Sequence, residues 1–405
     1  MLYRADWVLP ISGRPIRDGA VLTGSGRIVA VLGRGESAQA LGPASRDPVE
    51  TLDLGAAAIL PGLVNAHTHL ELSWMRNRVP PSSSMPGWAS TLMALRREQG
   101  SDPPAPIADA IRESRAAGTA LVGDVTNTLA AYDLLSASRL AGDIFYELLG
   151  FNPPLPQKLV QAARSSLDQL APDVRWRRSI VPHAPFSVSP ALFQAIAGAA
   201  GDLPVSVHLG ESAEEMEFLH RGTGAWRELL GRIGAWNEEW QPPACGPVEY
   251  LDRLGLVNDR LLAVHGTQLS QPELARLAAA QSTLVTCPRS NRWTGAGTPP
   301  LESFYASGVR VAVGTDSLAS VEDLNVFAEL ACMRTLAPHI PAARLLESAT
   351  LAGARALGLA DQFGTIEAGK RAELIAVRVP RGVDDVEEYL VSGLQPDAIE
   401  WLETA

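Results

Sequence analysis

Two histidines one residue apart, His67 and His69, close an apolar stretch that begins near residue 56. Successive side chains of a β-strand alternate between its two faces, so these two imidazoles point the same way and Thr68 points the other way. Two imidazoles on one face at the end of a strand can supply half of the ligands of a protein metal site. The pattern therefore predicts that further ligands follow at the ends of other strands.

Later apolar stretches also end in side chains that could bind a metal or move a proton. These are His183, His208 with Glu211 three residues on, His265 and Asp316. Five of the 7 histidines of the chain therefore stand at expected strand ends. Imidazoles and carboxylates that converge at one place are what a water-activating metal centre requires, so the joint set predicts such a centre.

Single members of this set also have ordinary structural interpretations. A lone histidine at a strand end is often a hydrogen-bonded core residue, and the prolines on either side of His183 could simply shape a loop. Glu211 could favour the dipole of the helix that follows it. However, Ser212 and Glu215 already form the pattern of a capping box, which leaves Glu211 without a structural task.

Elements that could bring these residues together alternate regularly from residue 57 onward. Expected strands cover 57–63, 120–125, 144–149, 179–183, 205–208, 261–265, 283–287 and 309–315. Expected helices include 107–117, 159–170, 191–200, 271–280, 321–335 and 342–356. Eight strand–helix repeats predict an α/β protein with a TIM-like (β/α)8 barrel, whose chemistry sits where strands run into loops. An open doubly wound sheet is the alternative, but the chain lacks its glycine fingerprint.

The two ends of the chain have a different character from the middle. Residues 2–56 contain short strands and turns, too few to form a sandwich alone, and strand character returns at 364–370 and 372–379. We therefore expect a small β-sandwich domain from residues 1–56 plus 364–405 and a catalytic barrel domain from residues 57–363. The proline-rich loop 74–88 is placed to cover the mouth of the barrel.

Composition narrows the class of partner. The 405-residue chain has a net charge of −11, which argues against nucleic acid or an anionic membrane surface as its main partner. No segment approaches the about 20 apolar residues of a membrane span, and the charged N-terminus does not resemble a signal peptide. Three scattered cysteines indicate a reducing compartment. We expect a cytoplasmic enzyme that acts on a small molecule and could form a homo-oligomer.

The motifs occur in the order of a known family. They are PGLVNAHTH at 61–69, HLGE at 208–211, VHG at 264–266, CPRSN at 287–291, GTDS at 314–317 and GTIEAGK at 364–370. The chain resembles the amidohydrolase superfamily, in its cytosine-deaminase-like branch of chlorohydrolases and aminohydrolases. That family combines a β/α barrel with a β-sandwich from both termini.

The resemblance implies a ligand set. In it His67, His69, His208 and Asp316 bind one divalent metal, Zn²⁺ or else Fe²⁺, which suit three imidazoles and a carboxylate. Glu211 and His265 are implied to act beside that metal.

A branch of the superfamily with two metals bridges them through a carbamylated lysine at the end of the fourth strand. The corresponding residue here is His183, and the only two lysines of the chain, Lys158 and Lys370, lie away from the expected strand ends. The resemblance therefore implies a mononuclear site and disfavours the dihydroorotase, hydantoinase and phosphotriesterase types.

The activity implied is hydrolytic deamination of a cyclic amidine. Metal-activated water would attack an amine-bearing ring carbon after giving its proton to Asp316, while His265 orients the water. Glu211 would protonate the neighbouring ring nitrogen and help ammonia to leave.

The stretches 67–73 and 183–189 are most similar to adenosine-type deaminases, the aminodeoxyfutalosine deaminases above all. The resemblance implies a 6-aminopurine nucleoside with a bulky 5′ substituent. Glu71, His183 and Arg289 are the expected substrate contacts, although Glu71 could equally be a solvated loop acid. Trp88 could stack on the base, but ordinary packing is the simpler interpretation.

Three alternatives stay open. The same constellation suits a deaminase of adenosylhomocysteine or methylthioadenosine, or a chlorohydrolase of triazine-like rings. A barrel that has lost activity and serves as a binding module would belong to a different class, but such proteins usually lose metal ligands, and none of the implied ligands is missing here.

Overall fold

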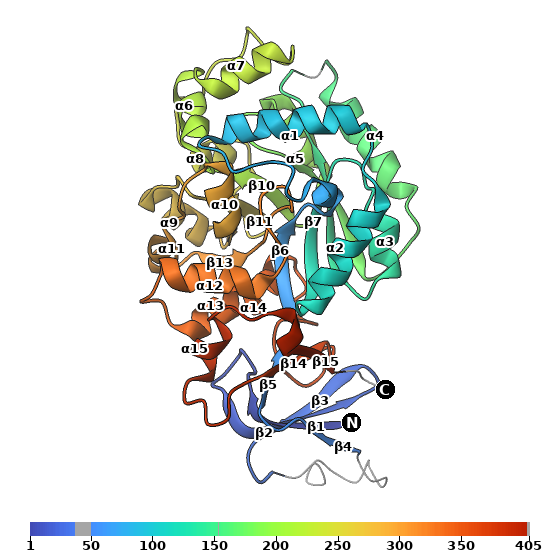
Figure 1. Cartoon of the computed structure of the whole chain (residues 1–405). Helices are drawn as coiled ribbons and strands as arrows, with labels where there is room; N and C mark the ends of the chain where they lie inside the picture. The colour runs from blue at the N-terminus through green and yellow to red at the C-terminus, as the bar shows by residue number, and fades with distance from the viewer. Residues whose placement is uncertain (37–49, 153, 403–405) are drawn as a thin grey trace.

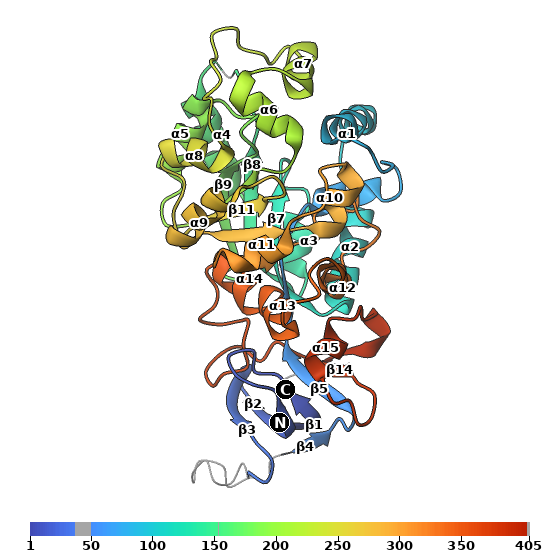
Figure 2. The ribbon, with the colours of Figure 1, turned by 90° about the vertical axis from the view of Figure 1, so that its left-hand side faces the viewer.

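The computed structural model describes residues 1–36, 50–152 and 154–402. In Figure 1 a barrel with its surrounding helices stands above a smaller β domain, which holds the first strands and the last. Figure 2 shows from a second side that the two ends of the chain lie together in this lower domain. The predicted division into a barrel and a domain made from both termini is therefore visible in the arrangement of the elements.

Eight parallel strands form the barrel. They are β6 (Leu63–Thr68), β7 (Thr119–Thr126), β8 (Ala141–Leu148), β9 (Trp176–Pro182), β10 (Val205–Leu209), β11 (Leu261–His265), β12 (Thr283–Thr286) and β13 (Arg310–Val313). They pair as two four-stranded parallel sheets, β6 to β9 and β10 to β13. The sheets meet where the backbone N–H of Asp316 donates to the carbonyl of His67 (3.0 Å) and that of His208 to the carbonyl of His183 (2.9 Å). The TIM-like α/β fold is thus confirmed.

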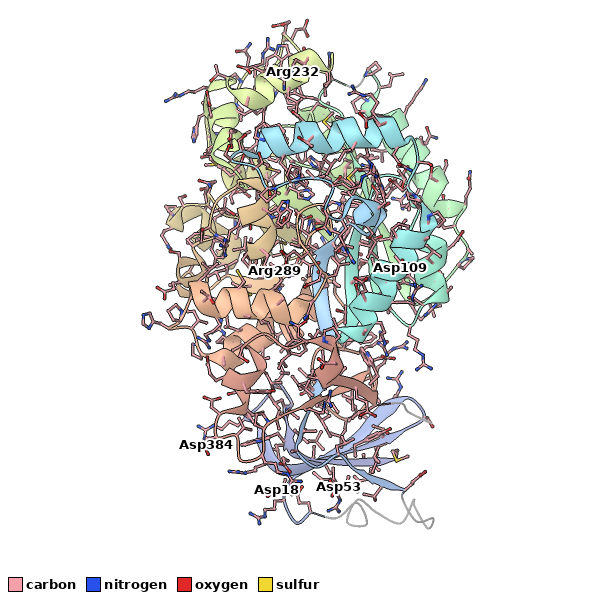
Figure 3. The ribbon with its side chains drawn as sticks, in the orientation of Figure 1. Asp18, Asp53, Asp109, Arg232, Arg289 and Asp384 are labelled. Carbon is pink, nitrogen blue, oxygen red and sulfur yellow. The ribbon has the colours of Figure 1, made fainter. Side chains whose placement is uncertain are left out.

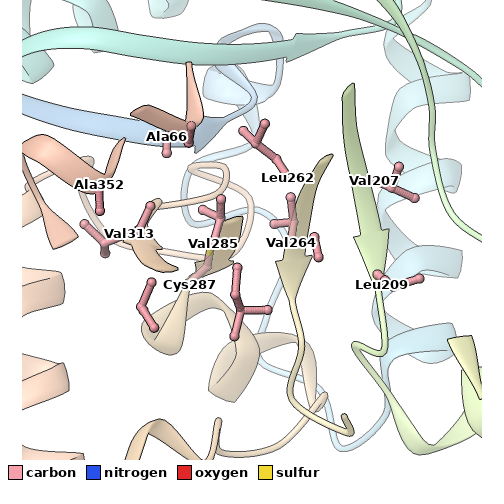
Figure 4. Packing of buried hydrophobic residues seen from close by; sticks show 14 of the residues in the cluster. Ala66, Val207, Leu209, Leu262, Val264, Val285, Cys287, Val313 and Ala352 are labelled. Carbon is pink, nitrogen blue, oxygen red and sulfur yellow. The ribbon is translucent and has the colours of Figure 1, made fainter. Parts of the chain in front are cut away.

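The barrel strands are buried on both faces, which explains their sequence. Every residue of β10, β11 and β12 is buried. Parallel strands covered by helices outside and by other strands inside read as continuous apolar runs, not as alternating ones. Figure 4 shows this packing, with Val207, Val264, Val285 and Val313 contributed by four neighbouring strands.

Most predicted helices are present within a few residues. The barrel helices include α2 (Pro104–Ala116), α3 (Tyr132–Ala137), α4 (Pro156–Asp168), α5 (Pro190–Ala199), α8 (Pro247–Arg253), α9 (Gln271–Ala279), α11 (Leu301–Ala306) and α12 (Val326–Leu336). The predicted helix 342–356 is instead two helices, α13 (Ala342–Ser348) and α14 (Leu351–Ala356). Thr350 interrupts it, because its φ of −136° and ψ of −93° are not helical and its hydroxyl donates to the carbonyl of Leu346 (2.6 Å).

The β domain is built on one sheet with the strand order β15-β14-β5-β1-β2-β3, and β4 pairs with β1. Its strands are β1 (Leu2–Val8), β2 (Ile16–Gly24), β3 (Arg27–Leu32), β4 (Thr51–Asp53), β5 (Ala57–Pro61), β14 (Leu374–Arg378) and β15 (Ile399–Leu402). Short elements α15 (Val386–Leu390) and η3 (Pro396–Ala398) lie between the last two strands. Residues 37–49 and 403–405 of the predicted domain lie outside the described residues.

The predicted first barrel strand, 57–63, was wrong in its position. Residues Ala57–Pro61 form β5 and pair with β14 and β1 in the β domain, and the barrel begins with β6. The chain passes from one sheet to the other at Gly62, where a Cβ atom would stand 2.6 Å from that of Ala120 and 2.9 Å from the Trp401 ring. The boundary between the domains therefore falls at Gly62, five residues after the predicted one.

The mouth of the barrel is covered by helices. The short helix η2 (Leu70–Met75) follows β6, and α1 (Met85–Gln99) then runs across the top of the barrel in Figure 1. Figure 2 shows α6 (Ala213–Arg221) and α7 (Ala225–Arg232) beside it at the same end. The predicted covering loop, 74–88, thus leads into a helix that does the covering. Within the described part of the chain, no helix has both the length and the apolar character that crossing a bilayer requires.

Candidate metal and catalytic site

Three imidazoles and a carboxylate meet at the end of the barrel where the strands run into loops. His67 lies in β6, His69 follows the end of that strand, and His208 lies in β10; one ligand atom from each falls within 4.8 Å of the others. Asp316 follows β13, and its Oδ1 lies 3.6 Å from His69 Nε2 and 3.9 Å from His67 Nε2. The structure therefore brings together the four residues that the sequence proposed as a ligand set, although they are separated by up to 249 residues of chain.

The chemistry of these side chains fits a divalent cation. His67 is fully buried, and among the described residues neither of its ring nitrogens has a hydrogen-bond partner. Burial, and then the charges of neighbouring histidines, holds the pKa of His67 and of His69 well below the ordinary value, so both rings are neutral. A buried polar group without a partner costs free energy, and a metal accepting lone pairs from neutral imidazoles removes that cost.

Asp316 is held so that one oxygen faces the histidines. Its Oδ2 accepts from the hydroxyls of Ser290 (2.5 Å) and Ser320 (3.4 Å), which leaves Oδ1 toward the imidazoles. Burial raises the pKa of Asp316 to about 6, and the hydrogen bond from Ser290 opposes that shift. The backbone of Asp316 is left-handed, with φ +61°, as is that of His265 at +76°. Such strain in non-glycine residues is typical of functional sites, where the surrounding fold maintains it.

Glu211 and His265 stand together beside this cluster. Glu211 Oε2 lies 3.5 Å from His265 Nε2, and the amide Nδ2 of Asn291 lies 3.0 Å from His265 Nδ1. An amide oriented in this way donates to Nδ1, so Nε2 carries the ring proton and points at the glutamate. Burial, and then the negative charges of Asp316 and Glu215, raises the pKa of Glu211 well above its ordinary value. This shift favours the protonated form of Glu211, in which it can act as an acid.

Glu215 has a task that differs from the predicted one. The hydroxyl of Ser212 does accept the N–H of Glu215 (3.3 Å), as a capping box requires. The Glu215 carboxylate, however, turns to the N–H groups of Gly210 and Glu211, each at 2.9 Å. It thereby fixes the backbone that carries Glu211. The capping pattern could show that Glu215 binds backbone, but not which backbone.

Two predicted substrate contacts do not line the cavity over the site. The carboxylate of Glu71 is buried and accepts from the N–H of Asn127 (3.0 Å), the hydroxyl of Thr128 (2.7 Å) and the guanidinium of Arg96 (2.5 Å). Its position two residues after His69 suggested the pocket, but the short helix η2 turns it into the protein. These partners use the hydrogen-bonding capacity of the carboxylate, so Glu71 is not free to contact the substrate.

Arg289 is likewise engaged elsewhere. It lies on α10 (Pro288–Thr294), and its guanidinium binds Glu329 (2.7 Å) and Asp323 (2.9 Å) at the start of the α12 region. Figure 3 labels Arg289 within the body of the barrel. It joins two elements and does not reach the cavity.

His183 is the predicted contact that does line the cavity. Its ring centroid is 4.8 Å from that of His208, and its Nδ1 lies 2.5 Å from the hydroxyl of Ser187. Burial lowers the pKa of His183 to about 4, so the ring is neutral. A neutral imidazole at this place can donate to or accept from a ring nitrogen or a sugar oxygen.

The cavity above the cluster has a polar floor and apolar walls, and it encloses about 1110 Å³ when its mouth, which opens to solvent, is included. Its floor contains His69, His208, His265, Glu211 and Asp316. Its walls come from α1, from the segment around α7 and from the loop after β9, and they include Trp88, Leu92, Met93, Phe186, Trp226 and Leu230. A mostly apolar pocket with a few convergent polar groups is the usual form of a small-molecule site. Phe186 lies in the stretch 183–189 that resembles the deaminases, and Trp88 is the residue expected to stack or pack; the other wall residues lie on α1 and α7, outside the motifs.

Comparison with known proteins places this site in a family. The model of the amidohydrolase family matches residues 58–393. An aminodeoxyfutalosine deaminase of Deinococcus radiodurans is 33% identical over 327 residues, which cover 75% of this chain and 74% of that protein. A 5-methylthioadenosine/S-adenosylhomocysteine deaminase of Moorella thermoacetica is 30% identical over 409 residues, covering 96% of this chain and 89% of that protein.

Solved structures agree over nearly the whole length. The aminofutalosine deaminase of Helicobacter pylori in complex with methylthio-coformycin has a TM-score of 0.83 and 26% identity, covering 96% of this chain and 95% of that chain. An adenosine deaminase of Xanthomonas campestris with bound zinc has a TM-score of 0.80 and 29% identity, covering 98% and 90%. The chain therefore belongs to the amidohydrolase family, as a hydrolase that acts on carbon–nitrogen bonds other than peptide bonds.

Proposed function

We propose that this protein is a metal-dependent hydrolytic deaminase of a 6-aminopurine nucleoside with a bulky 5′ substituent, aminodeoxyfutalosine first among the candidates. The observation that carries the proposal is the position of Glu211. It lines the cavity, it lies beside His265 next to the cluster of imidazoles and Asp316, and its burial raises its pKa and so favours its protonated form. An acid beside a water-activating metal, and not bound to it, is the recurrent arrangement of metal-dependent base deamination.

In this proposal His67, His69, His208 and Asp316 hold one divalent cation, zinc by analogy with the Xanthomonas campestris enzyme. When bound, such a cation lowers the pKa of water from about 15.7 to about 7. Asp316 Oδ1 accepts the proton of the attacking water, because its other oxygen is already occupied by Ser290. His265 orients that water through its Nε2–H.

Glu211 completes the exchange. Its proton goes to the ring nitrogen next to the amine-bearing carbon as the new carbon–oxygen bond forms. The hydroxyl on that carbon then gives its proton to the Glu211 carboxylate as the carbonyl forms. Asp316 gives the proton that it took from water to the amino group, and the carbon–nitrogen bond breaks to release ammonia. One water is consumed, the amine is replaced by a carbonyl oxygen, and no oxidant or reductant takes part.

The walls of the cavity favour a large, mostly apolar 5′ substituent. Aromatic and aliphatic side chains from α1 and α7 surround the space above the polar floor. Of the relatives' named substrates, aminodeoxyfutalosine and adenosylhomocysteine carry a charged group on the 5′ substituent, which needs a partner when it leaves water, and the Arg96 guanidinium of α1 lines the cavity. Aminodeoxyfutalosine is the first candidate because of the Deinococcus radiodurans relative. Methylthioadenosine is the second candidate, supported by the Moorella thermoacetica relative.

A panel of substrates tests the proposal. We would compare aminodeoxyfutalosine, methylthioadenosine, adenosylhomocysteine, adenosine and a triazine, following ammonia release and the loss of adenine absorbance with zinc-loaded protein. We expect the highest kcat/KM for aminodeoxyfutalosine. Turnover of the triazine alone, or of none of the four adenosines, would contradict the proposal.

A further inference from the structure

A glutamate that the motifs did not reveal stands behind one of the metal-binding imidazoles. Glu147 lies near the end of β8 and is buried. Its Oε1 is 3.4 Å from His208 Nδ1 and has no hydrogen-bond partner at closer range among the described residues. Its other oxygen, Oε2, accepts from the amide of Asn127 at 3.0 Å. One oxygen of the carboxylate is thus fixed, and the second faces the histidine.

The orientation of Asn127 follows from its neighbours. A guanidinium can only donate, and that of Arg96 lies 2.9 Å from Asn127 Oδ1. The amide Nδ2 must therefore point the other way, where it donates to both the carbonyl (3.1 Å) and the carboxylate of Glu147. Arg96 is itself held by Glu71. A continuous chain of hydrogen bonds runs from the covering helix α1, which carries Arg96, to Glu147.

The surroundings of His208 determine which of its nitrogens can bind a metal. Two acceptors face Nδ1: the carbonyl of His183 at 3.1 Å and Glu147 Oε1. Two acceptors on one side of the ring require the proton to be on Nδ1, which leaves the lone pair of Nε2 for a cation. A carboxylate behind a metal-binding histidine orients the ring and makes it a stronger ligand.

We propose that Glu147 is a positioning residue for His208, and that Arg96 on α1 holds Glu147 in place through Asn127. The proposal rests on the metal site of the proposed function, but on neither its substrate nor its chemistry. It assigns a task to Arg96 and Asn127, which line the same cavity, and to the buried Glu71 that binds Arg96. It also makes the affinity for the metal depend on a helix that covers the substrate.

Zinc affinity in the absence of substrate tests this inference. Zinc would be added back to metal-free protein in competition with a chromogenic chelator, for wild type and the Glu147→Gln variant. A glutamine of the same shape keeps the bond from Asn127 by turning its oxygen to that amide, so its NH2 group, a donor in place of an acceptor, faces His208 Nδ1. We therefore expect zinc to bind about 10- to 100-fold more weakly. The stoichiometry should stay at one zinc per chain.

The Arg96→Met variant should also bind zinc more weakly than wild type. The effect should be smaller than that of Glu147→Gln, because Arg96 acts only through Asn127.

The matched control is Asp143→Asn, another buried acid on the same strand, which pairs with Arg177 (2.7 Å) and not with a histidine. It should leave zinc affinity unchanged. Equal zinc affinity in wild type and Glu147→Gln would overturn the inference while leaving the deaminase proposal intact. Two zinc ions per wild-type chain, with one lost in Glu147→Gln, would also overturn it, because Glu147 would then be a ligand together with His183 and His208. Wild-type protein that binds no zinc would instead refute the proposed metal site itself.

Discussion

Glu211 is the residue on which the proposed chemistry depends, since it is an acid in the cavity whose protonated form is favoured by burial, and Glu215 holds its backbone. We expect Glu211→Gln to keep its metal and to lose turnover by about 10²- to 10⁴-fold, the usual contribution of a general acid or base. Steady-state kinetics measures the loss of turnover, and elemental analysis of the same preparation checks that the metal is retained. Glu214→Gln, in the first turn of α6, is the control and should turn over normally. A fully active Glu211→Gln enzyme would remove this residue from the mechanism.

The structure brings together the residues that their type and spacing pointed out, and it places elsewhere the residues whose partners are distant in the sequence. The histidines at strand ends, Glu211 and Asp316 are marked by spacing after apolar runs. Glu71 looked like a substrate contact because it follows His69, but its partners come from residues 126–128, more than fifty positions away. Ser290, Ser320 and Glu147 were missed for the same reason: common residue types carry no signal until the fold sets them beside Asp316 or His208.

At the scale of elements, Arg289 joins α10 to α12 and so supports the two residues of α10 that hold the site, Ser290 and Asn291. Replacing it with leucine leaves Glu329 fully buried without its partner. We expect Arg289→Leu to lower the free energy of unfolding by about 3 to 5 kcal/mol, the cost of stranding a buried charge. Urea unfolding of wild type and of the variant measures this loss in the free energy of unfolding.

The double variant Arg289→Leu/Glu329→Leu should regain much of that loss, because no charge is then stranded. Arg253→Leu, which breaks an exposed pair with Glu249, is the control and should leave the free energy of unfolding nearly unchanged. A single Arg289→Leu variant as stable as wild type would contradict this account of the α10–α12 contact.

The contact between β8 and β9 gives a pH dependence. Burial raises the pKa of Asp143 from 3.8 to about 7, although the Arg177 guanidinium opposes the shift. An acid whose pKa is higher in the folded protein binds its proton more tightly there, so its contribution to the free energy of unfolding falls as the pH rises from about 4 to about 7 and is constant above. Relative to Asp143→Asn, wild type should therefore lose stability over this range. Unfolding of both proteins at several pH values checks the sign of this change. A wild-type protein that gains stability relative to Asp143→Asn as the pH rises would refute the prediction.

Elements were predicted best where one environment surrounds the whole segment. The barrel strands can be recognised in the sequence as continuous apolar runs, because helices and other strands bury both of their faces. Residues 57–61 have the same apolar character, yet they belong to the β domain, and only the close packing at Gly62 separates them from β6. Hydrophobicity reports burial but not which core a strand joins. The break in the helix at Thr350 could not be predicted from the sequence either, since one threonine does not interrupt a helical pattern.

At the scale of the whole molecule, the metal site ties together both halves of the barrel. His67 and His69 lie on the sheet β6 to β9, whereas His208 and Asp316 belong to the sheet β10 to β13 or follow it. A cation bound only by the folded protein adds stability by mass action, about 2.7 kcal/mol at a concentration one hundred times its Kd. We therefore expect chelator-treated protein to unfold at a lower Tm, and added zinc to restore it. A Tm that responds to neither would show that the cation does not couple the two halves.

The most direct test of the central claim is the metal content of the purified protein. Protein prepared without chelator is analysed for divalent metals, beside a variant carrying His67→Ala and His208→Ala. If the four converging residues form one site, wild type contains about one equivalent per chain, and the variant close to none. Wild-type protein with no bound metal, or a variant that retains a full equivalent, would contradict the account.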